Sequence, residues 1–306
     1  MDLPLAAPVK KTQLGMQQLI LFATILTGCA PCLGQDALFV QMTEGAGDHR
    51  YPVWSPTQGY LALESTRDGN WEIYVVRLDD RSIARFTADD ADDRYPAWDI
   101  DSRRILFQST RSGRPELHMV DLKDYSTNLV GHLNGEELYP DWSSDGRRIA
   151  MALAADSVSQ IVVLSSDGSS GTVAPSPHGG TWPRWSPDDR KIAFSSRRDT
   201  QGADEEIYIL DTIDSTVRRL TDRPGHDICP TWSPTGDRIA SVGIEADGTR
   251  SLRVIPVDGG GPTAVLQTTF YRITEPDWSP DGKFIAVAAK RTRDDPYHIF
   301  IIEMEK

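Results

Sequence analysis

The stretch "EPDWSPDGKFIAV", Glu275 to Val287, is one of six copies of the same dozen residues in this chain. The other copies are "YPVWSPTQGYLAL" from Tyr51, "YPAWDIDSRRILF" from Tyr95, "YPDWSSDGRRIAM" from Tyr139, "WPRWSPDDRKIAF" from Trp182 and "CPTWSPTGDRIAS" from Cys229. Their central tryptophans are Trp54, Trp98, Trp142, Trp185, Trp232 and Trp278, at intervals of 43 to 47 residues. A repeat of this length built from short strands predicts the four-stranded blades of a β-propeller.

Each copy begins a unit in which four strands are predicted. The Pro-x-Trp segment is the first strand, and Ser279-Pro280-Asp281-Gly282 after it has the residue preferences of a type I turn. A second apolar strand follows, as in residues 285–287, and then a third that is rich in β-branched and aromatic residues, as in residues 299–302. A weaker fourth strand, such as residues 217–221, ends the unit. We therefore expect an all-β, six-bladed propeller.

The two ends of the repeat predict how the ring closes. The sixth unit stops after its third strand, whereas the segment before the first unit reads as one strand too many. We expect residues 37–43 to pair with the third strand of the last unit, which removes an exposed strand edge. The alternative is a disordered N-terminal tail.

The N-terminal residues differ from the repeat region and resemble a secretory signal. Lys10 and Lys11 precede a short apolar run, and the run ends at "LTGC", which is similar to a bacterial lipobox with Cys29 as the acylated residue. Ordinary cleavage near Gly34 is the alternative. We expect residues 1–28 to be the signal, 29–36 a short tether and 37–306 the propeller. The protein is then exported, either periplasmic, anchored to a membrane by lipid, or secreted.

Composition limits the partners of the protein. The chain has 306 residues, 39% apolar and 25% charged, with a formal net charge of −13. A surface this acidic argues against nucleic acid, whose phosphates require clustered Lys and Arg, and against anionic lipid. The chain has three cysteines, Cys29, Cys32 and Cys229, whose spacing indicates no disulfide framework.

The repeated unit resembles the WD40-like PD40 repeat of the TolB propeller family. Its elements are Pro-x-Trp-Ser-Pro-Asp-Gly, Ile-Ala-Phe, Ser-x-Arg-Asp-Gly, Glu-Ile-Tyr and Leu-Thr. The resemblance implies a protein–protein interaction module of the cell envelope, with a Tol–Pal-like assembly as the natural partner. TolB carries an α/β domain before its propeller, and only about eight residues separate Cys29 from the first predicted strand here. Functions that depend on that domain are not implied.

Binding is expected on the face where the fourth-to-first and second-to-third strand loops gather, because these loops vary between units. Four histidines lie in the fourth-to-first loops: His49, His132, His178 and His226. Carboxylates such as Asp227 accompany them, and the loop before the second unit carries Asp89, Asp90, Asp92 and Asp93. These residue types can bind a divalent metal, calcium above all, but their offsets follow no fixed pattern. We expect no cofactor, with calcium as the alternative.

Arginines recur in the second-to-third strand loops of four units, and units three and five carry Ala155 and Glu245 instead. These arginines are Arg67, Arg111, Arg198 and Arg291. One interpretation is a ring that grips carboxylates of a ligand, since arginine offers a bidentate fork. The other is a repeated ion pair with the acidic loops, because a contact between or within blades recurs with the blades.

The residue between Pro and Trp differs from unit to unit, unlike a purely structural position. It is Asp141 in the third unit, Arg184 in the fourth and Asp277 in the sixth. We expect Asp141 and Arg184 to pair near the central channel, with Asp277 across the ring. These charges either face a ligand or are simply solvated.

Catalytic motifs are absent from the sequence. It contains no Gly-x-Ser-x-Gly elbow, no phosphate-binding Gly-Lys-Ser/Thr loop and no zinc-type cysteine pairing. We therefore predict a non-catalytic exported binding propeller that engages envelope proteins or peptides. The alternative is a metal-dependent polysaccharide lyase or hydrolase of the propeller type.

Overall fold

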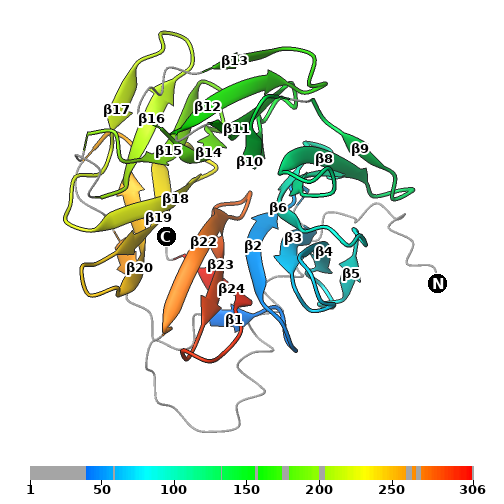
Figure 1. The fold of residues 1–306 in the computed structure, drawn as a ribbon. Coiled ribbons are helices and arrows are strands. Elements are labelled where there is room, and N and C mark those ends of the chain that lie inside the picture. The colour runs from blue at the N-terminus through cyan, green and yellow to red at the C-terminus, as the bar shows by residue number, and fades with distance from the viewer. Residues whose placement is uncertain are drawn as a thin grey trace, which may run out of the picture.

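The structure is a computed structural model that describes residues 39–57, 59–131, 133–155, 158–173, 179–199, 204–259, 264–266 and 270–304. The described residues form a ring of six four-stranded antiparallel sheets (Figure 1). We call these sheets blades 1 to 6 in chain order and name their strands a to d, from the centre of the ring outward. The predicted six-bladed propeller is confirmed.

The strand bounds repeat closely from blade to blade. Blade 1 contains β2 (His49–Trp54), β3 (Tyr60–Ser65), β4 (Glu72–Arg77) and β5 (Ile83–Arg85). Blade 2 contains β6 (Asp93–Trp98), β7 (Arg104–Ser109), β8 (Glu116–Asp121) and β9 (Thr127–Leu129). Blade 3 contains β10 (Glu136–Trp142), β11 (Arg148–Ala155), β12 (Val158–Ser165) and β13 (Gly171–Val173). Blade 4 contains β14 (Thr181–Trp185), β15 (Lys191–Ser196), β16 (Glu206–Asp211) and β17 (Val217–Arg219). Blade 5 contains β18 (His226–Trp232), β19 (Arg238–Ile244), β20 (Arg250–Pro256) and β21 (Ala264–Leu266). Blade 6 contains β22 (Arg272–Trp278), β23 (Phe284–Lys290), β24 (His298–Glu303) and β1 (Phe39–Gln41).

The hydrophobic core lies between blades. Leu61 of blade 1 and Ile299 of blade 6 belong to one buried cluster, and Ile73 of blade 1 shares the next cluster with Phe107 of blade 2. Four further clusters fill the remaining seams in the same way. The apolar strands recur in the sequence because each blade must cover the faces of both neighbours.

The ring closes through the N-terminal strand, as predicted. β1 pairs with β24, with Val40 opposite Ile301, and Figure 1 shows the two strands side by side. The Ile299 amide donates to the Thr43 hydroxyl at 2.9 Å, as the Ile73 amide donates to Thr87 in blade 1. The N-terminal segment therefore forms strand d of blade 6 and makes the same threonine hydrogen bond as in blade 1.

Each strand a carries the same bulge. The residue before its proline has φ between 51° and 55°, and the register of strands a and b shifts there. These residues are Tyr51, Tyr95, Tyr139, Trp182, Cys229 and Glu275. A bulge turns the side chain away from the regular alternation. Successive aromatic rings in blades 1 to 4 then lie 5.0, 4.6 and 5.1 Å apart, which forms a continuous aromatic row.

The part of the chain that the structure describes contains no helix long and apolar enough to cross a membrane.

Candidate functional site

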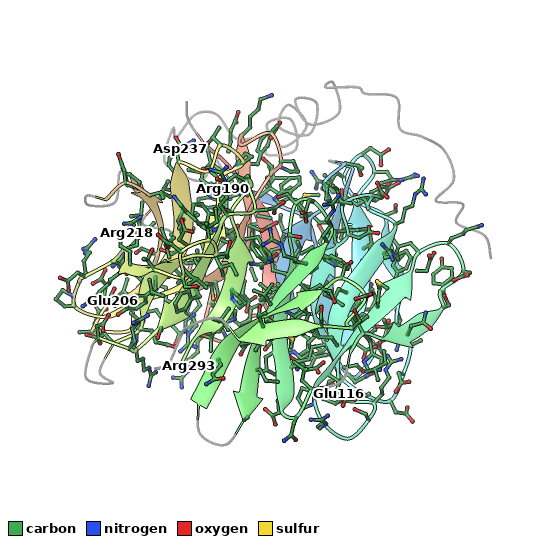
Figure 2. All side chains as sticks on the ribbon, turned by 90° about the horizontal axis from the view of Figure 1, so that it is seen from above. Glu116, Arg190, Glu206, Arg218, Asp237 and Arg293 are labelled. Carbon is green, nitrogen blue, oxygen red and sulfur yellow. The ribbon has the colours of Figure 1, made fainter. Side chains whose placement is uncertain are left out.

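A cavity of about 340 Å³ lies at the centre of the ring, where the six strands a face one another. All six repeat tryptophans line it, together with residues of the a–b turns such as Pro56, Ile100 and Pro187. Figure 2 shows that Arg190 and Asp237, from two of these turns, lie at the opposite end of the molecule from Glu116 and Arg293. The cavity is therefore at the a–b turn end, whereas the sequence placed binding on the loop end as well as in the channel.

Asp141 and Arg184 meet on the wall of this cavity, as the sequence predicted. Arg184 Nη1 donates to Asp141 Oδ1 at 3.1 Å, and the side chains are 10% and 17% exposed respectively. The Arg184 guanidinium also lies over the Tyr51 ring, with 5.3 Å between Cζ and the ring centroid. Because Tyr51 belongs to blade 1, the arginine reaches from blade 4 across the ring.

Asp277 lines the same cavity from blade 6. Its carboxylate accepts the Trp54 amide at 2.8 Å and the Thr231 hydroxyl at 3.2 Å. Burial raises the pKa of Asp277 to about 6, although Arg184 acts to lower it. The cavity thus holds one guanidinium between two carboxylates, and the protonation of Asp277 sets its net charge near pH 6.

The two aspartates also have a structural role that the sequence reasoning missed. Asp141 accepts the Trp185 amide at 2.7 Å, just as Asp277 accepts that of Trp54. Each carboxylate therefore accepts an amide of strand a in the next blade. Strand a is the edge strand of its sheet, with strand b on one side only. The sequence feature that could have indicated this role is the motif Pro-Asp-Trp, which occurs only in the units of blades 3 and 6.

The four loop arginines share one contact within their own blades. Arg67 lies over Tyr74, Arg111 over Phe107, Arg198 over Tyr208 and Arg291 over Phe300, with Cζ to centroid distances from 5.3 to 5.8 Å. Arg111 also pairs with Asp93 at 2.8 Å, which is the predicted ion pair with an acidic loop. The cation–π contact is the common feature and explains why the arginine recurs.

Blade 5 uses a different arrangement at the same place. Arg253 of β20 stands opposite Ser241, in the register position that Tyr74 and Tyr208 occupy in their blades. It is 2% exposed and pairs with Asp227 and Glu245. A β-carbon on Gly243 would lie 2.1 Å from Arg253 Cζ, so only glycine leaves room for this guanidinium. Glu245, the exception in the sequence, is the partner of a buried arginine.

Of the four predicted loop histidines, the structure describes two, His49 and His226, which lie in different blades. His49 is fully buried and stacks on His298 at 5.5 Å, at the seam between blades 1 and 6. His226 lies in blade 5, where its Nδ1 accepts the Glu205 amide at 3.0 Å. His132 and His178 lie outside the described residues, as does Cys29.

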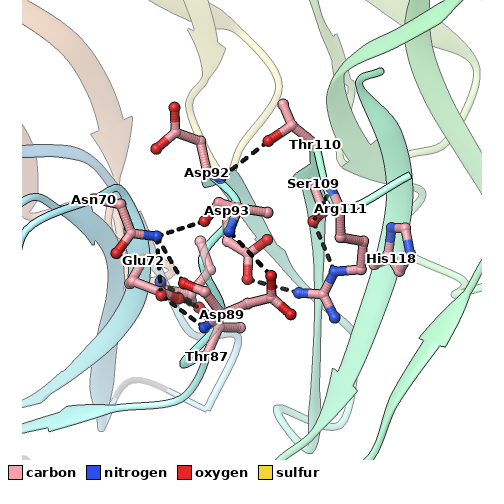
Figure 3. A network of polar contacts seen from close by, with 12 residues as sticks. Asn70, Glu72, Thr87, Asp89, Asp92, Asp93, Ser109, Thr110, Arg111 and His118 are labelled. Atoms are coloured by element: carbon pink, nitrogen blue, oxygen red, sulfur yellow. Dashed lines mark hydrogen bonds and ion pairs between the residues drawn. The ribbon is translucent and has the colours of Figure 1, made fainter. Parts of the chain in front are cut away.

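The acidic loop before blade 2 is part of a hydrogen-bond network (Figure 3). Glu72 accepts the Asp89 amide at 2.9 Å, and Asp92 accepts the Trp71 amide at 3.1 Å. Burial raises the pKa of Asp93, against the lowering effect of Arg111. Nowhere in the described ranges do three His, Cys, Asp or Glu side chains gather closely enough to hold a metal ion. The Asp92 carboxylate instead joins this loop to Trp71 of blade 1, and Asp93 pairs with Arg111 of its own blade.

A family model described as the TolB β-propeller domain, PD40, matches residues 39–178 and 138–306. Two relatives are similar over part of the chain. The "uncharacterized peptidase YuxL" of Bacillus subtilis is 31% identical over 40% of the chain, and dipeptidyl-peptidase 5 of Porphyromonas gingivalis is 33% identical over 33%. The matched regions span 24% and 16% of those relatives' lengths.

Solved structures share the fold. TolB from Acinetobacter baumannii has a TM-score of 0.65 at 18% identity, with 95% of this chain and 69% of that chain covered. An oligogalacturonate lyase in complex with manganese has a TM-score of 0.64 at 13% identity, with 88% and 93% covered. At these identities the likeness extends to the fold alone.

Proposed function

The chain belongs to the TolB β-propeller (PD40) family, and on that basis we propose that it is a non-catalytic binding propeller of the bacterial cell envelope. Its partners are envelope proteins, engaged through peptide segments, with a Tol–Pal-like assembly as the first candidate. Export through residues 1–28 and acylation of Cys29 belong to the same proposal. Palmitate labelling that the wild type shows and Cys29→Ser lacks would support the anchor.

The observation that carries the proposal is the cavity at the a–b turn end. Its wall combines tryptophan and proline surface with three charged side chains, Asp141, Arg184 and Asp277. Binding sites typically combine an apolar lining with a few placed polar groups in this way. The turns that surround it come from one closed ring of blades, so we infer that the site is preformed.

The loop residues are less available for ligand binding, because they contact other residues of the propeller. Arg67, Arg111, Arg198 and Arg291 pack on aromatic rings of their own blades. His49 and Asp227 are buried in seams and ion pairs. We therefore place the peptide at the cavity and assign these loop residues mainly to the scaffold.

Two exposed isoleucines allow a matched test. Ile100 is 50% exposed and lines the cavity, whereas Ile213 is 74% exposed in a c–d turn and does not. A photo-crosslinking amino acid is placed at either position in the native cell envelope, and captured proteins are identified by mass spectrometry. We expect position 100 to capture a defined envelope protein that position 213 does not.

The second arm of the test uses Ile100→Glu, which places a charge at the cavity mouth, with Ile213→Glu as the control. We expect Ile100→Glu to reduce recovery of the same envelope protein at least about tenfold, since one desolvated charge costs more than 1.4 kcal/mol. Equal capture from both positions, or equal recovery with both variants, would show that the cavity is not the binding site.

The rival function is metal-dependent cleavage of a polysaccharide, for which the fold of the manganese-bound lyase is the favouring observation. It requires metal ligands that converge, and His49 and His226 lie in different blades with different neighbours. Stoichiometric divalent metal in the purified protein, with turnover of uronic-acid oligomers that His49→Ala and His226→Ala abolish, would favour the rival over our proposal.

A further inference from the structure

Four cations and two tyrosines gather at the loop end of the ring, opposite the cavity. This basic–aromatic cluster consists of Arg50, Arg250, Arg272, Lys290, Tyr271 and Tyr297. Arg50 and Arg272 lie at the start of strand a in blades 1 and 6, Arg250 begins strand c of blade 5, and Lys290 ends strand b of blade 6. Tyr271 lies in the connection from blade 5 into blade 6, and Tyr297 lies in the b–c connection of blade 6. The cluster therefore spans three neighbouring blades.

The cations alternate with the aromatic rings. Lys290 Nζ lies 5.6 Å from the centroid of Tyr271 and 5.3 Å from that of Tyr297. On the outer sides, Arg272 Cζ lies 5.8 Å from Tyr271 and Arg50 Cζ lies 5.0 Å from Tyr297. The rings hold the positive charges in place. Lys290 Nζ also donates to the Arg293 carbonyl at 2.7 Å.

Ion pairs among the described residues balance only part of the positive charge of the cluster. Of the four cations, only Arg50 makes an ion pair there, with the buried carboxylate of Glu275. Arg272 and Lys290 stand directly opposite each other on β22 and β23, and like charges in this position destabilise a sheet. The loop between Lys290 and Tyr297 also carries Asp294 and Asp295, and the Asp295 carboxylate accepts the Thr292 amide at 2.8 Å.

Arg250 adds a third cation without an ion pair among the described residues. Burial lowers its pKa, and the positive charges of Arg272 and Arg50 lower it further. The two other arginines therefore repel Arg250, which a folded protein tolerates at a cost. A bound anion would remove that cost, and this excess of positive charge is located on a chain whose net charge is −13.

The cluster is accessible to a partner. Tyr271 is 46% exposed, Arg272 is exposed, and Arg50, Lys290 and Tyr297 are partly exposed. An arginine guanidinium can bind a carboxylate with two parallel hydrogen bonds. The faces of the tyrosine rings offer apolar surface to the peptide chain that carries the carboxylates.

We propose that the basic–aromatic cluster docks a short acidic peptide segment of a partner protein. The charge of the molecule around the cluster limits the length of the bound partner segment. A long polyanion, such as nucleic acid or an anionic membrane surface, would extend from the cluster over an otherwise acidic molecule and be repelled. A segment with a few Asp or Glu residues is short enough to remain at the cluster. The site lies at the opposite end from the cavity, so it does not depend on the function proposed for the cavity.

The test measures binding of a fluorescein-labelled octapeptide with four Glu and four Gly residues by fluorescence anisotropy, at low salt. A peptide with four Gln in place of Glu is the ligand control. The protein variants are Arg272→Glu and Lys290→Glu. Arg190→Glu is the protein control, because it makes the same change in net charge on an exposed residue at the a–b turn end.

We expect the Glu peptide to bind the wild type and Arg190→Glu equally, and Arg272→Glu and Lys290→Glu at least about tenfold more weakly, because each reversal removes a cation and adds a repulsion. Thermal unfolding verifies that all variants are folded. The proposal is overturned if the Gln peptide binds as well, if Arg190→Glu weakens binding equally, or if the wild type prefers polygalacturonate or anionic vesicles to the peptide.

Discussion

A single side chain can explain an exception in a repeat, as Arg253 does in blade 5. In four blades a loop arginine lies over an aromatic ring, but blade 5 carries Glu245 in the loop and Arg253 in strand c. Asp227 faces this arginine as Asp93 faces Arg111 in blade 2. Both blades have an aspartate at the start of strand a. Its arginine partner comes from the b–c loop in blade 2 and from strand c in blade 5.

This exchange predicts strong coupling between two substitutions. Arg253→Tyr alone leaves Asp227 buried without its partner and is expected to cost about 3–5 kcal/mol of the free energy of unfolding. Glu245→Arg alone places a second arginine beside Arg253 and also destabilises. The double variant restores the loop arginine over a strand-c tyrosine, as in blades 1 and 4, and keeps an arginine near Asp227. We therefore expect it to regain at least about 1 kcal/mol relative to the sum of the single changes.

Urea unfolding of the wild type, both single variants and the double variant forms the cycle that measures this coupling. Additive free energies would mean that Arg253 and Glu245 contribute independently.

A pair of stacked histidines lies beside the site where the N-terminal segment closes the ring, because His298 begins β24 and the next residue, Ile299, accepts the Met42 amide. His49 and His298 stack at 5.5 Å, and neither ring nitrogen of His49 makes a hydrogen bond with a described residue. Burial, followed by His298 and Arg67, lowers the pKa of His49 to about 4, although Asp48 acts in the opposite direction. The folded state therefore binds fewer protons than the unfolded chain between pH 4 and pH 6.5.

Stability contributed by neutral His49 is present above pH 6.5 and is lost as the pH falls toward 4. By pH 5 the loss is on the order of 2 kcal/mol. We expect His49→Phe, which keeps the stacked ring without the charge, to remove most of this acid sensitivity. Hydrogen exchange of the amides in residues 39–43 should accelerate from pH 7 to pH 5, after correction for intrinsic rates, in the wild type and much less in the variant.

His226→Phe is the matched control, because His226 lies in blade 5 and does not contact β1. If it protects residues 39–43 as well as His49→Phe does, the acid sensitivity of the seam has another origin.

The whole ring depends on the one strand that comes from the opposite end of the chain. Five blades are made from continuous segments, and blade 6 alone combines residues 272–303 with β1. β1 covers the edge of β24 and brings Met42 into the cluster between blades 6 and 1. An uncovered edge is a template for pairing with another chain.

A chain that starts at residue 44 should therefore lose the monomeric state, whereas a chain that starts at residue 39 should keep it. Size-exclusion chromatography with light scattering measures this difference, and thermal unfolding should show a lower midpoint for the shorter chain. If both chains are monomeric with the same midpoint, the closing strand contributes little to the ring.

The sequence by itself determined the propeller, the number of blades and the closing strand. Those features depend on a local pattern of tryptophan, turn and apolar strand, which each blade must repeat in order to pack on its neighbours. It also placed Asp141 beside Arg184, because adjacent blades bring equivalent positions together.

Only the tertiary structure decided which polar residues belong to the scaffold and which remain available. The loop arginines pack on aromatic rings of their own blades, and Glu245 pairs with Arg253. His49 stacks on His298 at the seam between blades 1 and 6. The basic–aromatic cluster unites Arg50, Arg250 and Lys290, which are up to 240 residues apart in the chain. Such groupings arise from ring closure and strand register, and a single unit of the repeat contains neither.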